Sequence, residues 1–281
     1  MAKEKELTHG VTVPAPVQSC NRGCVPPFPR HSLRAGKDNR MAAPVVIVGA
    51  TGAIGSAIAR RVAARGDALH IVGRDAAKLA ALAGQLGATY AVADAMDGAA
   101  LAVAVRAAGP AVAGLAYCVG SIVMKPVRRA TEADYLDAFR LNAVGAALAV
   151  AAAADGLRAV PGAGVVLFST VAVRSGFANH AVISMAKGAV EGLTVALAAE
   201  LAPQVRVNCI APSLTRSGIA ASMTDNEAMA KAIAAQHPIP RLGEGDDAGA
   251  LAAFLLGPDA GWITGQVIAV DGGRSSLRTK G

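Results

Sequence analysis

Three glycines stand at a spacing that suits phosphate binding. They follow the apolar run 45–48 and open a segment with helical periodicity. A strand, a glycine-rich turn and a helix, in that order, let the backbone approach a pyrophosphate, whose charge the free N–H groups at the helix start favour. The residues expected to bind it are Gly49, Thr51, Gly52, Ile54 and Gly55. This turn predicts a dinucleotide site, and the alternative is an ordinary tight turn.

Two later positions bear on which dinucleotide binds. An acidic side chain after the second strand would accept hydrogen bonds from the ribose 2′-hydroxyl of NAD. That place holds Gly73 followed by Arg74, and a guanidinium can pair with the 2′-phosphate of NADP. We therefore favour NADP over NAD, although the neighbouring Asp75 weakens the choice and Arg74 could simply be a solvated residue at a helix start. Asp94, after the third strand, is placed to meet the adenine ring.

The elements that must position these residues alternate along the chain. Short apolar runs, expected to be strands, lie at 45–48, 68–72, 89–92, 114–119, 164–168, 205–210 and 266–270. Helical patterns fill the gaps near 53–65, 75–86, 98–108, 131–155, 181–202 and 246–256. The alternation predicts an α/β fold, with a Rossmann-like, doubly wound parallel sheet of about seven strands in a single domain over 41–281. Segment 213–242 breaks the rhythm, and we expect it to be a mobile lid over a site at the strand ends.

Composition narrows the class of protein. With 281 residues, 53% of them apolar and only 17% charged, the chain can bury a large core, and its many alanines predict close helix packing. The longest apolar stretch, 143–154, is shorter than the roughly 18 to 20 residues that span a bilayer, so we expect no membrane partner.

Basic charge is concentrated at the start of the chain. Residues 1–40 hold seven Lys or Arg against three Asp or Glu, a net of +4 out of the total of +7. They also contain five of the fourteen prolines and no regular apolar pattern, which predicts a disordered tail. Because Met41 directly precedes the first apolar run, we favour Met41 as the natural start. A charged tail without interleaved aromatic residues does not predict a nucleic-acid partner.

The four cysteines do not form a disulfide framework. Cys20 and Cys24 lie in the tail, whereas Cys118 and Cys209 lie in apolar, strand-like runs. This usage favours a reducing, cytoplasmic location. Cys20 and Cys24 with the nearby His31 lack a fourth ligand, so no metal site is expected.

Several segments together resemble the short-chain dehydrogenase/reductase family over 44–275. They are the Gly49 turn, Asp94, the Cys118-Val119-Gly120 turn, Asn142, Ser169-Thr170, Ala186-Lys187, 205–212 and 263–273. The resemblance implies a nicotinamide cofactor across the strand ends and a homo-oligomer, tetramer or dimer, built partly on the helix of Lys187. Cofactor contacts are implied for Cys118, Val119, Gly120, Lys187, Pro212, Ser213, Thr215 and Ser217. Of these, Ser213 stands where the family usually has glycine.

The chain departs from the family at the proton donor. The common form has a tyrosine four residues before the lysine, but here that residue is Ile183, and the only tyrosines are Tyr90, Tyr117 and Tyr135. The resemblance implies that Lys187 binds the nicotinamide ribose. Thr170 keeps a hydroxyl seventeen residues before that lysine, and Asn142 is the residue of the helix kink that can hold a water chain to the lysine. The chain is therefore identified as a divergent member that lacks the usual active-site tyrosine.

His180 offers one replacement. The enoyl-acyl-carrier-protein reductase branch of the family has its tyrosine seven residues before the lysine, which is the position of His180 here. Residues seven apart lie two turns along one helix face, so His180 and Lys187 could border one pocket. An imidazole suits acid–base work near neutrality, and even when neutral its N–H could stabilise an alkoxide. The alternative is a histidine at a helix start that does not react.

These observations favour an NADP(H)-dependent oxidoreductase that moves hydride between the nicotinamide and a small apolar carbonyl or activated alkene. The expected catalytic residues are Asn142, Thr170, His180 and Lys187. The alternative is a nucleotide-binding but catalytically silent sensor or assembly protein, which the loss of the tyrosine at Ile183 would explain.

Overall fold

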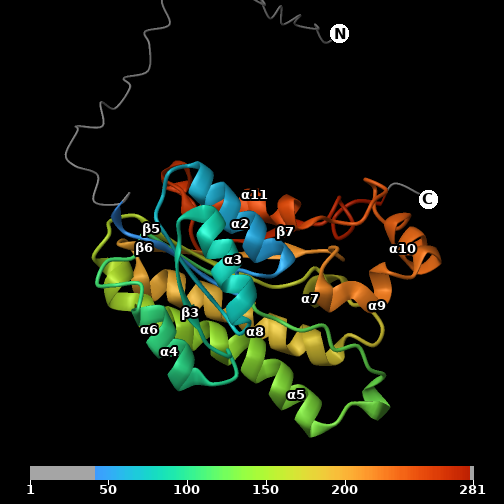
Figure 1. Ribbon diagram of the computed structural model, residues 1–281. Coiled ribbons are helices and arrows are strands. Elements are labelled where there is room, and N and C mark those ends of the chain that lie inside the picture. The colour runs from blue at the N-terminus through green and yellow to red at the C-terminus, as the bar shows by residue number, and fades with distance from the viewer. Residues whose placement is uncertain (1–41, 279–281) are drawn as a thin grey trace, which may run out of the picture. The chain divides into compact units, whose positions relative to one another are not determined.

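Seven parallel strands form one sheet in the computed structural model, which describes residues 42–278 (Figure 1). The strands are β1 (Val45–Val48), β2 (Leu69–Gly73), β3 (Thr89–Val92), β4 (Gly114–Tyr117), β5 (Ala163–Phe168), β6 (Val205–Pro212) and β7 (Val267–Val270). Their spatial order is β3-β2-β1-β4-β5-β6-β7, which confirms the predicted doubly wound fold. The predicted tail 1–40, with Cys20, Cys24 and His31, lies outside the described residues.

The order of the strands reverses between β1 and β4. Val48, the last residue of β1, lies opposite Val72 of β2 on one side and Tyr117 of β4 on the other. The carboxyl ends of these strands therefore reach the same edge of the sheet. In open α/β sheets the crevice outside that edge, at the reversal, is where ligands bind.

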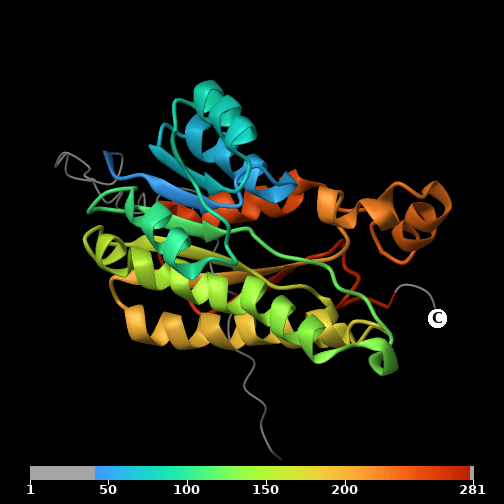
Figure 2. The same ribbon diagram turned by 60° about the horizontal axis from the view of Figure 1, so that its bottom comes forward.

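Helices cover both faces of the sheet (Figures 1 and 2). One face carries α2 (Ala53–Ala64), α3 (Ala76–Leu86) and α11 (Gly245–Leu256), and the other α4 (Gly98–Arg106), α5 (Glu132–Phe139), α6 (Gly145–Arg158) and α8 (Ala181–Leu201). Small residues let them approach closely: a Cβ on Gly249 of α11 would lie only 2.7 Å from the Cβ of Ala57 in α2. The predicted close helix packing is therefore present.

The expected continuous helix over 131–155 is interrupted. A π-helical turn, Arg140–Val144, separates α5 from α6 and contains Asn142. π turns inside α-helices are often found at functional sites. The apolar periodicity continues across this turn and did not reveal it, whereas the family resemblance placed a helix kink at Asn142.

Segment 213–242 contains short helices. They are a 3₁₀ turn at Gly218–Ala220, α9 (Ala221–Thr224) and α10 (Glu227–Ala234). A further one-turn helix, α7 (Ala172–Ser175), lies between β5 and α8. These pieces stand beyond the carboxyl ends of the strands, and α9 and α10 are the orange helices at one end of Figure 2.

Two helical stretches, Glu132–Arg158 and Ala181–Leu201, are long and apolar enough to cross a membrane by length and composition alone. The longest unbroken apolar stretch, 143–154, covers only part of the first of them and is too short to span a bilayer, so that count did not indicate their full length. Both pack against the sheet and place side chains such as Ala149 and Val190 in the core. Core helices of this kind pass the same test.

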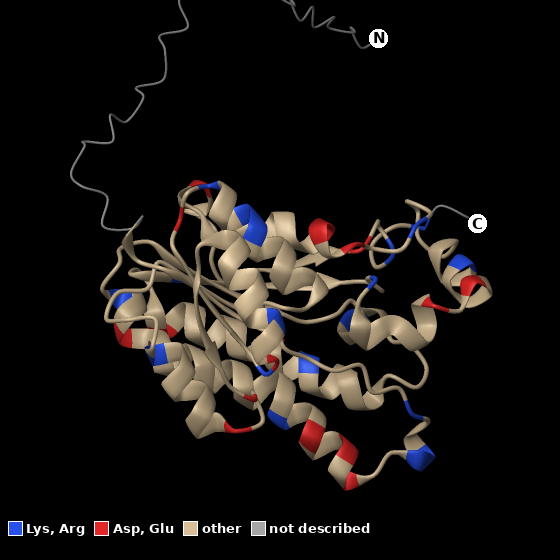
Figure 3. Ribbon diagram, in the orientation of Figure 1, with Lys and Arg blue, Asp and Glu red and all other residues tan. Residues whose placement is uncertain are grey.

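Over the described part of the chain, basic and acidic residues are interspersed rather than gathered on one element (Figure 3).

Candidate active site

The turn between β1 and α2 has the geometry of a phosphate cradle. Gly49 has a φ of +82°, a region that favours glycine, and a Cβ on Gly55 would collide with the carbonyl oxygen of Gly49. Gly52 closes the turn by donating its N–H to that carbonyl over 3.1 Å. No side chain caps α2, and its first turn carries no acidic residue. Its N-terminal N–H groups are therefore available to an anion.

Arg74 and Asp75 differ in their contacts. Asp75 caps α3: its carboxylate accepts from the backbone N–H of Lys78 at 3.0 Å and pairs with the Lys78 ammonium at 3.3 Å. The backbone hydrogen bond, and then that ammonium, lower the pKa of Asp75. Arg74 is exposed, and no ion-pair partner for it occurs within residues 42–278. Asp94, also exposed, accepts from the N–H of Met96 at 2.9 Å.

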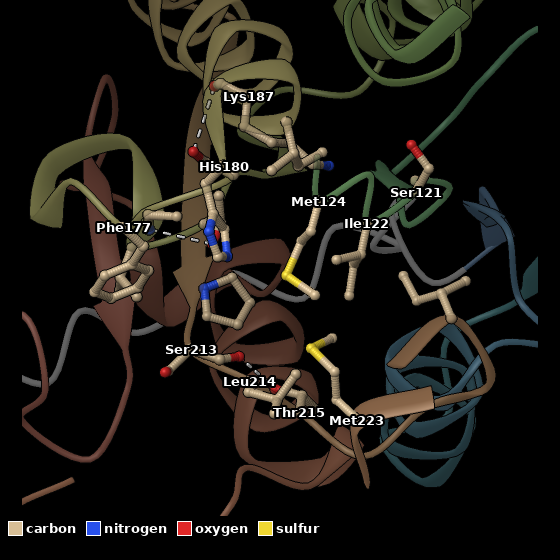
Figure 4. Close-up of a pocket in the computed structure, with 18 of the residues that line it drawn as sticks. Ser121, Ile122, Met124, Phe177, His180, Lys187, Ser213, Leu214, Thr215 and Met223 are labelled. Carbon is tan, nitrogen blue, oxygen red and sulfur yellow. Dashed lines mark hydrogen bonds between the residues drawn. The ribbon is translucent and has the colours of Figure 1, made fainter. Parts of the chain in front are cut away.

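A cavity of about 720 Å³ opens beyond β4, β5 and β6 (Figure 4). The predicted site residues that line it are Ile54, Cys118, Val119, Gly120, Thr170, His180, Lys187, Pro212, Ser213, Thr215 and Ser217. The remaining predicted residues, which do not line it, are Gly49, Thr51, Gly52, Gly55, Arg74, Asp94 and Asn142. Three of the four expected catalytic residues, Thr170, His180 and Lys187, thus meet the expected nicotinamide contacts in one cavity, and the glycine turn reaches it through Ile54.

Lys187 and Asn142 converge behind Gly120. Lys187 is buried, and its Nζ donates to the carbonyl oxygen of Phe168 over 2.8 Å. Burial lowers the pKa of Lys187 to about 8. A Cβ on Gly120 would stand 3.1 Å from that Nζ and 2.9 Å from Oδ1 of Asn142, so a larger residue there would displace the ends of these two side chains.

The Asn142 amide is held by its nitrogen. Nδ2 donates to the carbonyl oxygen of Ala138 at 2.8 Å and to Oγ of Ser121 at 3.2 Å. Oδ1 is buried and has no hydrogen-bond partner in the described part of the chain. This acceptor faces the same glycine as the lysine Nζ, which agrees with the predicted role of Asn142 beside Lys187.

His180 stands at the start of α8 with one ring nitrogen engaged. Nδ1 lies 2.7 Å from the carbonyl oxygen of Ala178, which can only accept, so Nδ1 carries the proton. When the ring is neutral, Nε2 is therefore an acceptor. The expectation that a neutral His180 offers an N–H to the substrate is wrong for this geometry, because the N–H points to the backbone. His180 can donate from Nε2 only as imidazolium.

Thr170 keeps its hydroxyl proton available. Its Oγ1 accepts from the N–H of Ala172 at 3.3 Å, which uses a lone pair. Ile183, where the family has tyrosine, is buried and borders the cavity with an apolar side chain. Of the expected catalytic residues, Thr170 and His180 thus place a hydroxyl and an imidazole on the cavity wall.

Two thiols adjoin the lysine. Burial raises the pKa of Cys118 and that of Cys209 to about 12, with a smaller opposite effect from Lys187 on each. Both thiols therefore stay neutral near pH 7, and they are free cysteines.

The sequence did not predict most of the cavity wall. Apolar lining residues include Ile122, Met124, Phe177, Ile219, Met223, Met229 and Ile233 (Figure 4). Arg274 also lines the cavity, whereas no aspartate or glutamate among residues 42–278 does. The sequence signal that could have identified Arg274 is its position directly after Gly272 and Gly273, the glycine pair that follows the last strand.

Comparison with known proteins agrees with this geometry. The family model described as Enoyl-(Acyl carrier protein) reductase matches residues 49–275. Galactitol 2-dehydrogenase (L-tagatose-forming) of Cereibacter sphaeroides is 35% identical over 239 residues, which cover 81% of this chain and 92% of that protein.

Solved structures show the same likeness. A short-chain type dehydrogenase/reductase from Mycobacterium ulcerans is 29% identical, with a TM-score of 0.78 over 84% of this chain and 90% of that one. A gluconate 5-dehydrogenase from Burkholderia cenocepacia, in complex with NADP and tartrate, is 25% identical, with a TM-score of 0.79 over 86% of this chain and 99% of that one.

Proposed function

Since this chain belongs to the short-chain dehydrogenase/reductase family of oxidoreductases, we propose that it moves hydride between NADP(H) and a small, apolar carbonyl or activated alkene. One observation carries the proposal. Thr170, His180 and Lys187 border a single cavity of about 720 Å³ together with the residues expected around the nicotinamide. The cavity wall is largely apolar, which suits a small apolar substrate and limits water.

The residues present fit a dinucleotide. The uncapped N-terminus of α2 and the glycine cradle would hold the pyrophosphate. Arg74 would pair with a 2′-phosphate, and the engagement of Asp75 as a helix cap supports NADP over NAD. Lys187 would hold the nicotinamide ribose. When bound, the cofactor supplies or accepts the hydride.

The chain's own groups would manage the substrate oxygen. The Thr170 hydroxyl donates a hydrogen bond to it, and the His180 imidazolium gives it a proton from Nε2 as the carbon is reduced. In the reverse direction neutral Nε2 takes that proton back, since Nδ1–H stays on the Ala178 carbonyl. Lys187, whose pKa of about 8 leaves it mostly charged at neutral pH, holds positive charge beside the developing alkoxide or enolate.

A second function is favoured by Ile183 alone. A buried, apolar side chain at the usual tyrosine position would suit a protein that binds the nucleotide without turning it over. Such a protein would act as a cofactor sensor or an assembly partner. The two functions share the fold and the cofactor site and differ only in turnover.

Turnover with NADPH separates them. The purified full chain is offered aldehydes, ketones, quinones and enones, and NADPH oxidation is followed by absorbance. We expect turnover that falls when Thr170 is changed to Val or His180 to Ala. Tight NADPH binding without turnover of any of these compounds would instead support the silent alternative.

We also propose that the protein acts on small molecules as a cytoplasmic homo-oligomer, a tetramer or dimer. Large apolar side chains are exposed along α5, α6 and α8: Leu136, Phe139, Leu148, Met185 and Val195. A second copy would cover this face. The free thiols Cys118 and Cys209 support a reducing location. Light scattering of the purified protein tests the oligomer.

A further inference from the structure

One cation borders the cavity without an acidic partner. Arg274 follows β7, and its guanidinium lines the same cavity as Thr170 and Lys187. Within residues 42–278 no carboxylate lies within ion-pair distance of Arg274. Asp271, from the same turn, lies beyond ion-pair distance and accepts from the N–H groups of Gly273 at 2.9 Å and Ser275 at 2.7 Å. Its charge still acts on Arg274 from that distance, where it raises the pKa of the guanidinium against the larger opposite effect of burial.

Neutral groups hold the guanidinium in place. Nη1 lies 3.4 Å from Oγ of Ser213, and Nη2 donates to Oε1 of Gln236 at 2.5 Å. The guanidinium carbon also stands 4.4 Å from the ring centroid of Phe177, a cation–π contact. Phe177 and Ser213 lie on one side of the cavity, with Ile122 and Met124 across from them (Figure 4). The cation is therefore fixed in orientation at one side of the cavity.

The Ser213 hydroxyl is oriented by a buried histidine. Nδ1 of His237 lies 2.9 Å from the carbonyl oxygen of Ile233, which can only accept, so Nδ1 carries a proton. In the neutral ring Nε2 is then an acceptor, and Oγ of Ser213, 2.8 Å away, donates to it. With its proton on that bond, the serine oxygen has lone pairs left to accept from Nη1 of Arg274. A glycine, usual for the family at this position, could not make this contact.

The guanidinium of Arg274 can donate more hydrogen bonds than these two. The bonds to Ser213 and Gln236 employ two of its five N–H donors, and neither partner brings a negative charge. Partial burial lowers the pKa of Arg274, although a guanidinium remains charged at neutral pH. With Lys187 as the other cation and no acid on the wall, the cavity favours an anionic guest.

We propose that Arg274 binds the carboxylate of the substrate, and that the substrate is an oxo acid or unsaturated acid whose apolar chain fills the cavity. This inference rests on the proposed function and names its substrate class. A carboxylate is planar and singly charged, so its two oxygens can accept two parallel N–H bonds from one guanidinium. The methionine and isoleucine side chains of the wall would pack on the carbon chain.

Binding of a non-reacting acid tests the site apart from turnover. Octanoate and its neutral isostere octanamide are titrated calorimetrically into the full chain saturated with NADP⁺. We expect octanoate to bind about tenfold tighter or more, the range of a charge-assisted hydrogen bond in a partly buried site. Arg274→Gln removes this preference and Arg274→Lys keeps part of it. Arg278→Gln, an exposed arginine of the same terminal segment, leaves it intact.

Each other outcome overturns the proposal. Equal binding of the two ligands by the wild type, or binding of neither, excludes a carboxylate site. If Arg274→Gln weakens both ligands equally or weakens NADP⁺ instead, Arg274 serves the fold or the cofactor. Because octanoate is not reduced, an absence of turnover in the enzyme screen would count against the proposed function while leaving the octanoate preference measurable.

Discussion

The phenol oxygen of Tyr117 donates a 2.7 Å hydrogen bond to the carbonyl oxygen of Leu141. This contact joins the end of β4 to the π turn that carries Asn142. Burial raises the pKa of Tyr117, so the phenol keeps its proton. Gly145 makes room for it, because a Cβ there would collide with the phenol oxygen. Tyr117 is thus a core residue that helps to shape the site.

Tyr117→Phe removes that hydrogen bond, which ties β4 to the π turn. We expect the free energy of unfolding to fall by about 0.5 to 1.5 kcal/mol, the net contribution of one hydrogen bond. Turnover should also fall, because the Asn142 amide depends on the same turn. Urea denaturation and steady-state rates measure the two effects. Tyr90→Phe, at an exposed tyrosine on the edge strand β3, is the matched control and should change neither quantity. Equal behaviour of the two variants would remove Tyr117 from this role.

The buried ammonium of Lys187 predicts a pH dependence of stability. Its pKa falls from the ordinary 10.5 to about 8 on folding, so between these pH values only the unfolded state binds the proton. The free energy of unfolding therefore rises with pH across this window, by about 3 kcal/mol in total, as the cost of burying the charge is relieved.

Comparison with Lys187→Met isolates this effect, since other titrating groups largely cancel in the difference. From pH 8 to 10.5, the wild type should gain about 3 kcal/mol relative to the variant in denaturant unfolding of the cofactor-free protein. A flat difference between the two proteins would mean that Lys187 keeps an ordinary pKa, contrary to its burial.

Sequence pattern predicted the fold because its signals are local. Each strand and most helices followed from apolar periodicity over a few residues, and Gly49 and Gly55 mark a turn whose conformation they alone permit. The family resemblance placed a helix kink at Asn142, but its π-helical form escaped prediction, and the contact that joins it to β4 links Tyr117 and Leu141, which are 24 residues apart. Periodicity carries no information about such a contact.

The sequence predicted the site residues that belong to a motif, but it did not predict those that tertiary packing alone brings to the cavity. Thr170, His180 and Lys187 were found from their spacing and the family resemblance, and all three border the cavity. Arg274 and Met124 are 150 residues apart in the sequence, so only tertiary packing brings them to one cavity. The proton position on His180 also needed the structure, because the Ala178 carbonyl decides it.

Arg74→Gln tests the choice of cofactor. If Arg74 pairs with a 2′-phosphate, the variant should lose about tenfold or more in NADPH affinity, whereas NADH affinity should change little. Fluorescence titration of each cofactor provides both values. Arg106→Gln removes another exposed positive charge, at the end of α4, and should affect neither cofactor. Equal losses of NADPH and NADH affinity in Arg74→Gln would overturn the assignment of NADP.

His180→Ala tests the proton donor. We expect kcat to fall by about 10²- to 10⁴-fold, the usual contribution of general acid catalysis. The ring is only partly buried and adjoins an open cavity, so added imidazole should restore part of the rate. Arg278→Ala, at an exposed residue, should respond to imidazole no more than the wild type does. A variant that keeps its full rate would show that His180 does not transfer the proton.

Ile183→Tyr, made in the His180→Ala background, tests whether the missing tyrosine is the reason for the unusual donor. The new phenol would stand four residues, about one helical turn, before Lys187, whose nearby charge would lower the phenol pKa. We expect the double variant to recover at least about tenfold of the rate lost in His180→Ala, without imidazole. Ile183→Phe, equal in shape but without the hydroxyl, should not recover it, which separates proton donation from packing. If the phenol restores nothing while NADPH affinity and unfolding remain those of the parent, then His180 acts by positioning rather than by proton transfer.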